Sequence, residues 1–445
     1  MSFPCLRLAS DLPPLDEILA DVFARKRPTV AERMAEAAVA GRTIVQPRCG
    51  VGGLMEMKTL LQELEAGAAP EVLSLTIDSH TRLERFERAA EILADDPSRL
   101  NGFPLVAHGY RAVRALADSI DAPLQVRHGS YDGRRLFAET LAAGLSSFEG
   151  GPIGYNIPYC RDVPIEQSLA AWAEIDDAAA RFTAAGMVIE REMFGSLTGV
   201  AVPPSIALAC TFIEAVMAAR AGVKSISIAI PQGGNMVQDI AALQAIPLLA
   251  ARWLPVDVAV HPVLHQFMGV FPQNRASADG LIFSGGLAGF YGGAHKIICK
   301  TYHEAIGVPT ASSNIAGLRL TRAALSGRLA TLPLPQAHIV AEREQILAET
   351  SEIVEPVLSA PDIVGALVEA FASGRLDIPF PANPVAQGDI YPVRDAAGAI
   401  RFGRTGNLPF SERTLRGATC TGGDKHPSLS EAVRDSLFYF STLRA

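Results

Sequence analysis

The chain has 445 residues, of which 49% are hydrophobic and only 19% are charged. This composition excludes a disordered chain and a collagen-like fibre, and the length allows one large barrel or up to about three domains. The 39 lysines and arginines are outnumbered by 47 aspartates and glutamates, which gives a formal charge of −8. Such a balance argues against a nucleic-acid partner bound through its phosphates.

Residues 1–42 are predicted to form an N-terminal helical arm, with Asp16 as a candidate N-cap. Acidic residues interrupt this segment, so it does not have the pattern of a signal peptide. The six cysteines are widely spaced without a CxxC pair, which indicates neither a zinc site nor a disulfide framework. No apolar run is long and uniform enough for a membrane span. We therefore expect a cytoplasmic protein.

Between residues 43 and 340, short apolar runs alternate with helical stretches, as in βαβ units with a parallel sheet. The clearest helices are predicted at 165–185 and 236–253. Strands are predicted at 43–46, 72–77, 104–107, 124–126, 146–148, 225–230, 256–260, 281–283 and 297–298. Periodicity leaves open a barrel or a doubly wound sheet, but no dinucleotide or Walker motif follows the first strand. The predicted fold is therefore α/β, a (β/α)8 TIM barrel over 43–340.

Residues 341–445 are predicted to form a C-terminal α+β extension. The stretch 340–373 has a helical pattern with breaks near Pro356 and Pro361, and 374–409 is rich in proline and glycine, as in a small subdomain. A mobile loop at 417–426 is expected before a last helix at 430–439.

Charged side chains follow the predicted strands. Arg48, Arg82 and Arg127 come after three different strands, His108 ends another, and Lys300 follows the last. The C-terminal ends of barrel strands converge on one face, so these residues predict a cationic pocket there. Arginine binds a carboxylate through two parallel hydrogen bonds, so three of them suit a small dicarboxylate. Taken singly, each arginine is better explained by a surface ion pair.

The segment EGGPIGYNIPY at 149–159 is rich in glycine and proline. A tight path here could present Glu149, Tyr155 and Tyr159 inward, with one anion to meet an ammonium group and two phenols to donate hydrogen bonds. A rigid loop with core tyrosines is an equally good interpretation from chemistry alone.

His261 and His265 are four residues apart, but the glutamate of an HExxH motif is absent and position 262 is proline. A metal-dependent barrel lyase or hydrolase that uses them with His108 and His128 remains an alternative. Hydrogen-bonded pocket or core histidines are the preferred interpretation.

Taken in order, several blocks resemble the epsilon subunit family of methylaspartate mutase, also called glutamate mutase. The resemblance covers about residues 40–410. The blocks are TIDSHTR (76–82), LNGFPLVAHG (100–109), RHG (127–129), FEGGPIGYNIPY (148–159), VPIEQSLAAW (163–172), GNMVQDIAAL (234–243), HQFMGVFPQ (265–273), KTYHEAIGVPT (300–310) and IPFPANP through PVRD (378–395).

The resemblance implies an adenosylcobalamin-dependent isomerase with a TIM barrel. It would interconvert L-glutamate and (2S,3S)-3-methylaspartate by radical fragmentation and recombination. The family's substrate contacts match Arg48, Arg82, Arg127, His128, Glu149, Tyr155 and Tyr159. Its cofactor contacts match Gly50, Asn101, Pro158, Phe271, Lys300, Glu304 and Val308.

The resemblance also implies a partner. The cobalt would be ligated by a small sigma subunit with a D-x-H-x-x-G motif, which this chain lacks, and this chain would form a homodimer within a heterotetramer. Cys49 stands where the family is expected to have glycine. A thiol near a radical is a hydrogen donor, so a paralogue acting on a related amino diacid stays open as an alternative.

Overall fold

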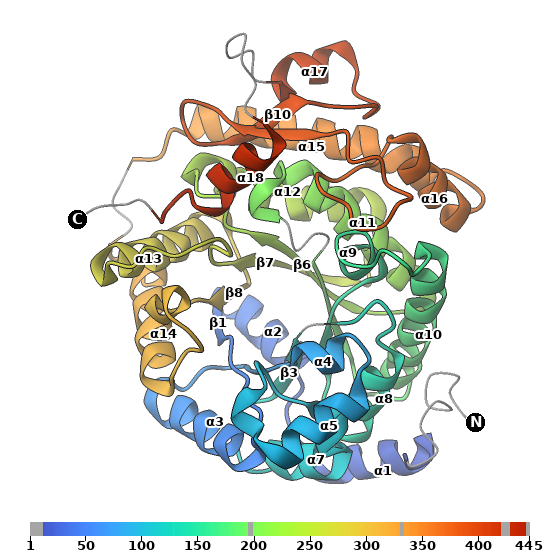
Figure 1. Ribbon diagram of the computed structural model, residues 1–445, viewed down its shortest axis with the longest axis vertical. Coiled ribbons are helices and arrows are strands. Elements are labelled where there is room, and N and C mark those ends of the chain that lie inside the picture. Colours follow the sequence, from blue (N-terminus) through green and yellow to red (C-terminus); the bar gives the residue numbers. More distant parts are fainter. Residues whose placement is uncertain (1–11, 128, 195–198, 330–332, 420–427, 442–445) are drawn as a thin grey trace.

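The computed structural model describes residues 12–127, 129–194, 199–329, 333–419 and 428–441, and Figure 1 shows a ring of strands inside a ring of helices. The strands form one parallel sheet in the order β1-β8-β7-β6-β5-β4-β3-β2. They are β1 (Ile44–Pro47), β2 (Leu73–Thr76), β3 (Leu124–Arg127), β4 (Ser147–Glu149), β5 (Glu190–Met193), β6 (Ser225–Pro231), β7 (Ala259–His265) and β8 (Lys296–Cys299). The predicted (β/α)8 TIM barrel with a C-terminal extension is thus confirmed.

At the seam between β1 and β2, hydrogen bonds join β2 to the end of β1 and to the residues that follow it. The amide of Thr76 donates to the carbonyl oxygen of Cys49 at 2.8 Å, and the Ser74 hydroxyl donates to the carbonyl oxygen of Pro47 at 2.6 Å. The seam therefore depends on a side chain as well as on backbone groups.

An outer layer of helices buries the apolar face of the ring. The predicted helices at 165–185 and 236–253 are confirmed as α10 and α12. The layer comprises α3 (Leu54–Ala68), α7 (Tyr110–Ala117), α8 (Arg134–Ala142), α10 (Ile165–Ala184), α11 (Pro204–Ala221), α12 (Met236–Trp253), α13 (Arg275–Gly292) and α14 (Ala311–Leu325). Helix α11 is long and apolar enough to cross a membrane, but 78% of it is buried inside this protein, as in a core helix.

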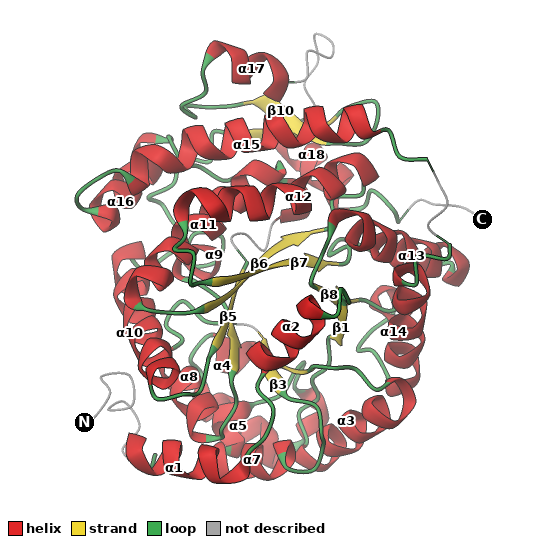
Figure 2. Cartoon of the chain, turned by 180° about the vertical axis from the view of Figure 1, so that it is seen from behind, coloured by secondary structure: helices red, strands yellow, loops and turns green. Residues whose placement is uncertain are grey.

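The N-terminal arm closes one end of the barrel. It consists of α1 (Leu15–Arg25) and α2 (Val30–Val39), and Figure 2 shows α2 lying across the ring of strands. Val30 and Met34 of α2 are buried against Ile44, at the start of β1. Asp16 lies in the first turn of α1 after an N-cap at Pro14, so the predicted cap was wrong.

The C-terminal extension packs against α11 and α12 (Figure 1). It contains α15 (Gln336–Leu358), α16 (Ile363–Ser373), the hairpin of β9 (Tyr391–Arg394) and β10 (Ile400–Arg404), α17 (Glu412–Ala418) and α18 (Leu429–Leu437). Pro356 lies inside α15 and does not end it, whereas Pro361 separates α15 from α16. Most of the predicted loop at 417–426 lies outside the described residues. The domain limits of 43–340 and 341–445 remain predictions.

Three predicted strands were wrong in position or type. The segment predicted at 104–107 is the short helix α6 (Leu105–His108), the one at 281–283 lies inside α13, and β7 begins three residues later than expected. Strand β5 was missed because its sequence, Glu-Arg-Glu-Met, is charged. Its glutamates point into the barrel, where they are paired, so the usual apolar pattern of a buried strand does not apply.

Candidate active site

Arg127 lies at the C-terminal end of β3 inside the barrel and is 2% exposed. Its Nη1 donates to Oε1 of Glu192 at 2.9 Å and to Oε1 of Gln125 at 2.7 Å, and its Nη2 lies 3.2 Å from Nε2 of His265. Burial lowers its pKa, but Glu192 and Glu149 more than offset this and raise the pKa above the usual value. The guanidinium therefore remains charged in a buried site.

Arg48 follows β1, and Lys300 follows β8, the neighbouring strand. Burial lowers the pKa of Arg48, Glu304 raises it and Arg127 lowers it further. Nζ of Lys300 donates to Oε2 of Glu304 at 2.7 Å, and burial lowers the pKa of Lys300 despite that carboxylate. Because these charges act on one another, the structure brings three predicted site cations together with Glu304 at the C-terminal end of the strands.

Glu149 and Tyr155 form a buried pair that acts on both Arg48 and Arg127. The Tyr155 hydroxyl lies 2.9 and 3.0 Å from the two carboxylate oxygens of Glu149 and donates to them. Burial and the Glu149 charge raise the pKa of Tyr155 well above its usual value, while Arg82 and Arg127 lower it. The pair thus lies within the field of two of the predicted substrate arginines.

Tyr159 and Arg82 lie nearer the rim. Tyr159 is 45% exposed, and partial desolvation raises the pKa of its phenol to about 12, with Arg82 lowering it and Glu149 adding to the rise. Arg82 ends the short helix α4 (Ser79–Arg82), and its buried Nε has no hydrogen-bond partner among the described residues. His128, the remaining predicted substrate contact, lies outside the described residues.

The loop that carries Tyr155 is held from below by α11. Oε1 of Glu214 accepts hydrogen bonds from the amides of Ile153 at 2.7 Å and Gly154 at 3.0 Å, at the start of α9 (Pro152–Asn156). A side chain at Gly151 would place its Cβ 2.4 Å from the Glu214 carboxyl carbon, so a larger residue there would displace this carboxyl group from its hydrogen bonds. Burial raises the pKa of Glu214 to about 8.

The C-terminal extension holds the far side of the same loop. The Asn383 side chain donates to Oδ1 of Asn156 at 2.7 Å and to the carbonyl oxygen of Val163 at 2.8 Å. The amide of Asn383 also donates to the carbonyl oxygen of Ile157 at 3.1 Å. A residue more than two hundred positions away in sequence therefore fixes the path that leads to Pro158 and Tyr159.

The predicted cofactor contacts occupy two kinds of position. Most lie on loops at the C-terminal face: Gly50 after β1, Asn101 before α6, half-buried Pro158 beside Tyr159, the pair of Lys300 and Glu304, and Val308, which is 56% exposed. Oδ1 of Asn101 accepts from the Ser79 amide at 2.9 Å. Phe271 is 2% exposed and packs in a side cluster with Phe267, so its side chain does not open onto the mouth.

The histidines considered as metal ligands lie apart. Nδ1 of His261 is 3.1 Å from Nδ1 of His295, whereas Nε2 of His108 is 2.9 Å from the carbonyl oxygen of Gly52. His265 stacks on Phe194, and burial lowers its pKa to about 4. Across the described ranges, no group of three histidine, cysteine, aspartate or glutamate residues is placed to hold a metal ion. The three described histidines thus do not form the metal site considered from sequence.

The sequence analysis missed a set of buried charges beneath the arginines. Glu190 and Glu192 lie on β5 with no exposed surface, and Nζ of Lys296 lies 2.8 Å from Oε2 of Glu192. The available signal was the spacing, since residues two apart on a strand share a face. In β3, Gln125 and Arg127 show the same spacing. Gln125 donates to both glutamates, and Arg127 donates to Glu192.

Cys49 lies just beyond the end of β1 and is buried in the core between strands and helices, in one cluster with Val45, Leu73 and Met57. Its Sγ donates to the carbonyl oxygen of Ser74 at 3.2 Å, and burial raises its pKa to about 11. The thiol is therefore a packing group of the core.

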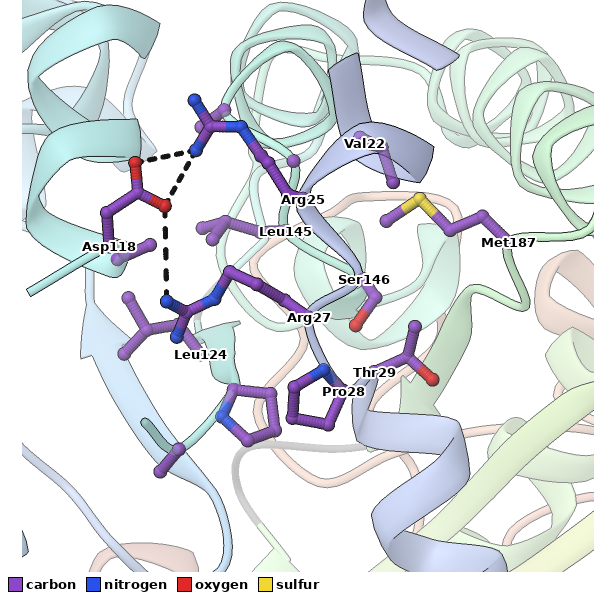
Figure 3. Close-up of a pocket in the computed structure, with 15 residues that line it drawn as sticks. Val22, Arg25, Arg27, Pro28, Thr29, Asp118, Leu124, Leu145, Ser146 and Met187 are labelled. Carbon is purple, nitrogen blue, oxygen red and sulfur yellow. Dashed lines mark hydrogen bonds and ion pairs between the residues drawn. The ribbon is translucent and has the colours of Figure 1, made fainter. Parts of the chain in front are cut away.

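A small pocket lies at the opposite end of the barrel, beside the turn between α1 and α2 (Figure 3). Its volume is about 40 Å³, which suits a water molecule rather than a substrate. Arg25 donates to both carboxylate oxygens of Asp118 at 2.7 Å, and Arg27 donates to the carbonyl oxygen of Ile120 at 2.5 Å. Both arginines already have protein partners, so this pocket is not a candidate active site.

Comparison with known proteins gives a consistent result. Residues 25–419 match the family model described as methylaspartate mutase E chain (MutE). The chain is 44% identical to the glutamate mutase epsilon subunit of Halobacterium salinarum, over 84% of this chain and 79% of that protein. It is 41% identical to the subunit of the same name from Desulfitobacterium hafniense, over 85% and 81%. It is 38% identical to the glutamate mutase epsilon subunit of Escherichia coli O157:H7, over 84% of this chain and 80% of that protein.

Proposed function

Because the chain belongs to the methylaspartate mutase E chain family, we propose that it is the catalytic subunit of an adenosylcobalamin-dependent isomerase that interconverts L-glutamate and (2S,3S)-3-methylaspartate. The observation that carries the proposal is the convergence of Arg48, Arg127 and the buried carboxylate of Glu149 on one pocket. Arginines match the two carboxylates of an amino diacid, and Glu149 matches its ammonium group.

The other proposed substrate contacts complete this arrangement. Arg82 and Tyr159 lie at the rim, and Tyr155 donates to Glu149. The hydrogen bonds from the Tyr155 hydroxyl fix the position of the Glu149 carboxylate, which is proposed to meet the substrate ammonium and to accept a proton from it. His128 is proposed as a further contact from the family resemblance. Together these groups would hold both ends of the substrate while its carbon skeleton rearranges.

The residues present fit the cofactor that the family implies. When bound, adenosylcobalamin would supply carbon-centred radical chemistry that the side chains of this protein lack. Buried Lys300 and half-buried Glu304 form an ion pair that offers both donors and acceptors, which suits the hydroxyl groups of the adenosine ribose. Gly50, Asn101, Pro158 and Val308 would line the rim around it, and Phe271 would contribute through its backbone.

A partner subunit follows from the same proposal. A small sigma subunit with a D-x-H-x-x-G motif would ligate the cobalt and cover the mouth, and this chain would form a homodimer within a heterotetramer. Apolar side chains exposed on the mouth loops would be buried by such a partner; they are Leu83, Tyr159, Ile306 and Val308. Covering them would also exclude water from the reacting groups.

The test is an anaerobic NMR assay of the full chain with a cobalamin-binding partner subunit, adenosylcobalamin and L-glutamate. The expected result is the methyl doublet of 3-methylaspartate, which should appear only when all components are present. If the complex forms and binds the cofactor but no doublet develops, glutamate is not the substrate and the proposal fails in favour of a related amino diacid. Failure to bind the cofactor with a cognate partner would overturn the mutase assignment itself.

A further inference from the structure

Strand β5 carries two fully buried glutamates beneath the pocket, and only one of them touches Arg127. Oε1 of Glu192 accepts from Nη1 of the arginine at 2.9 Å, and Oε2 lies 2.8 Å from Nζ of Lys296. Burial alone would raise the pKa of Glu192, but Arg127 and Lys296 hold it well below the usual range. Glu192 is therefore a carboxylate between two cations.

This contact determines which edge of Arg127 is open. A guanidinium has five N–H donors in a planar fork. The two on Nη1 are taken by Glu192 and Gln125, and Nη2 faces His265. The Nε group is buried and has no hydrogen-bond partner among the described residues. The edge formed by Nε and Nη2 is thus the one left to receive a carboxylate from outside the protein.

We infer that Glu192 is a positioning residue of the active site, which holds Arg127 by its Nη1 so that the Nε edge receives a substrate carboxylate. The inference rests on the proposed function for the identity of that ligand, L-glutamate. An arginine side chain has many rotamers, and fixing one of them before binding removes an entropic cost of association. Glu192 does not touch the substrate in this arrangement and acts through Arg127.

Glu190 provides a matched control. It lies on the same strand and inward face, is equally buried, and also contacts Lys296 and Gln125. Its other contacts are the hydroxyl groups of Ser147 and Ser227, and no contact with Arg127 is recorded in the described structure. Glu190→Gln therefore removes a buried charge from β5 without removing the group that holds the arginine.

The experiment compares Glu192→Gln and Glu190→Gln in the full chain. The dissociation constant for L-glutamate is measured by isothermal titration, and KM and kcat are measured in the assembled enzyme. Glu192→Gln is expected to weaken binding and raise KM by about 10- to 100-fold, and Glu190→Gln by less than about threefold. In both variants kcat is expected to change less than KM does.

A second variant guards against a purely structural effect. Glu192→Gln with Lys296→Met removes both charges of that buried pair, so the unpaired lysine no longer destabilises the fold. The binding defect should persist in this double variant because the neutral amide oxygen of glutamine holds Arg127 less firmly than the Glu192 carboxylate does. Unchanged affinity in the double variant, or equal defects in Glu192→Gln and Glu190→Gln, would overturn the inference.

The outcomes also separate this inference from the proposed function. Binding of L-glutamate by the wild-type chain without any isomerisation in the assembled enzyme would overturn the proposed reaction, while the titrations would still test Glu192. Isomerisation with equal affinity in wild type and Glu192→Gln would overturn only the inference. No binding of L-glutamate by the wild type would overturn both.

Discussion

Arginine side chains at the two ends of the barrel differ in their hydrogen-bond partners. At the N-terminal end, the partly exposed Arg25 and Arg27 lie beside Asp118 (Figure 3), and Arg27 also donates to a backbone carbonyl oxygen. Apolar side chains of α2 pack against the start of β1 at this end. At the C-terminal end, Arg82 and Arg127 each keep a buried Nε that no described residue accepts from. The Nε of Arg25 at the N-terminal end lies 2.9 Å from Oδ2 of Asp21, in an ion pair within the protein. Arg82 and Arg127 instead act on Tyr155 and lie among the proposed substrate contacts, and because a buried donor without a partner is costly, this indicates where a ligand belongs.

The difference follows from how the fold is built. Loops after the strands vary without disturbing the ring, whereas the N-terminal end is occupied by packing that supports it. Stability therefore depends on one end and ligand binding on the other, and substitutions at the two ends should have opposite signatures.

The largest effect is expected for Arg127→Ala. It removes the partner of a substrate carboxylate and leaves Glu192 with one cation fewer, so kcat/KM should fall by at least about a thousandfold, or about 4 kcal/mol. Steady-state kinetics of the assembled enzyme would measure this. Arg25→Ala, at the other end, is the control and should retain wild-type turnover. Wild-type kinetics in Arg127→Ala would remove it from the substrate site.

A smaller effect, on stability and its pH dependence, is expected for Glu214→Gln. The pKa of Glu214 is raised from 4.5 to about 8, so the folded state holds its proton more tightly and stability falls as pH rises between these values. Glutamine keeps the oxygen that accepts from Ile153 and Gly154 but does not ionise. The free energy of unfolding of the wild type should therefore fall between about pH 6 and about pH 8, and that of the variant should not. The difference between the two proteins should shift in favour of the variant by about 1–3 kcal/mol over this range.

Urea unfolding at both pH values would measure this change. Glu36→Gln, on the exposed side of α2, is a control that should leave the pH dependence as in wild type. Parallel pH dependence in Glu214→Gln and wild type would show that Glu214 is not the titrating group.

The next largest effect is expected for Asn383→Ala, which removes hydrogen bonds between the C-terminal extension and the segment 155–163. It removes the donor to Oδ1 of Asn156 and one of the two donors to the Val163 carbonyl oxygen, at a cost of about 1–2 kcal/mol. Since the loop carries Tyr155 and Tyr159, kcat/KM should fall about tenfold. Asn407→Ala, which removes an exposed hydrogen bond in the same extension, should keep wild-type kinetics. Equal kinetics in the two variants would mean that the extension does not position the loop.

The smallest effect is expected at the ion pair of the N-terminal end. Arg25 and Asp118 are partly exposed, so a double-mutant cycle with alanine at both positions should give a coupling of less than about 1 kcal/mol. Thermal unfolding of the single and double variants would measure it. A loss of activity in either variant would contradict the division of roles between the two ends.

The sequence predicted much of the barrel because helices α10 and α12 and strands such as β3 follow simple apolar periodicity. It failed at β5, where glutamates face the interior, and at 281–283, where an apolar stretch is a buried helix. Short apolar runs are ambiguous between the two types of element, since both can be buried on all sides. The rim segment at 104–107 failed for the same reason.

The candidate site shows the same division. Arg48, Arg127, Glu149 and Lys300 were identified from their places after strands, since the barrel rule brings all strand ends to one face. Glu192, Glu214 and Asn383 were not, because they lie within a strand, a helix and a distant extension. Their contacts with Arg127, with the amides of α9 and with Asn156 exist only after folding.

The sequence by itself thus determined the type of fold and the chemistry available at the strand ends, because both depend on local pattern and on a general rule of barrels. Only the tertiary structure decided which edge of Arg127 is open and that Cys49 is buried in the core. It also decided which distant residues bind the segment that carries Tyr155 and Tyr159. These depend on contacts between residues far apart in the chain, and local periodicity carries no information about such pairs.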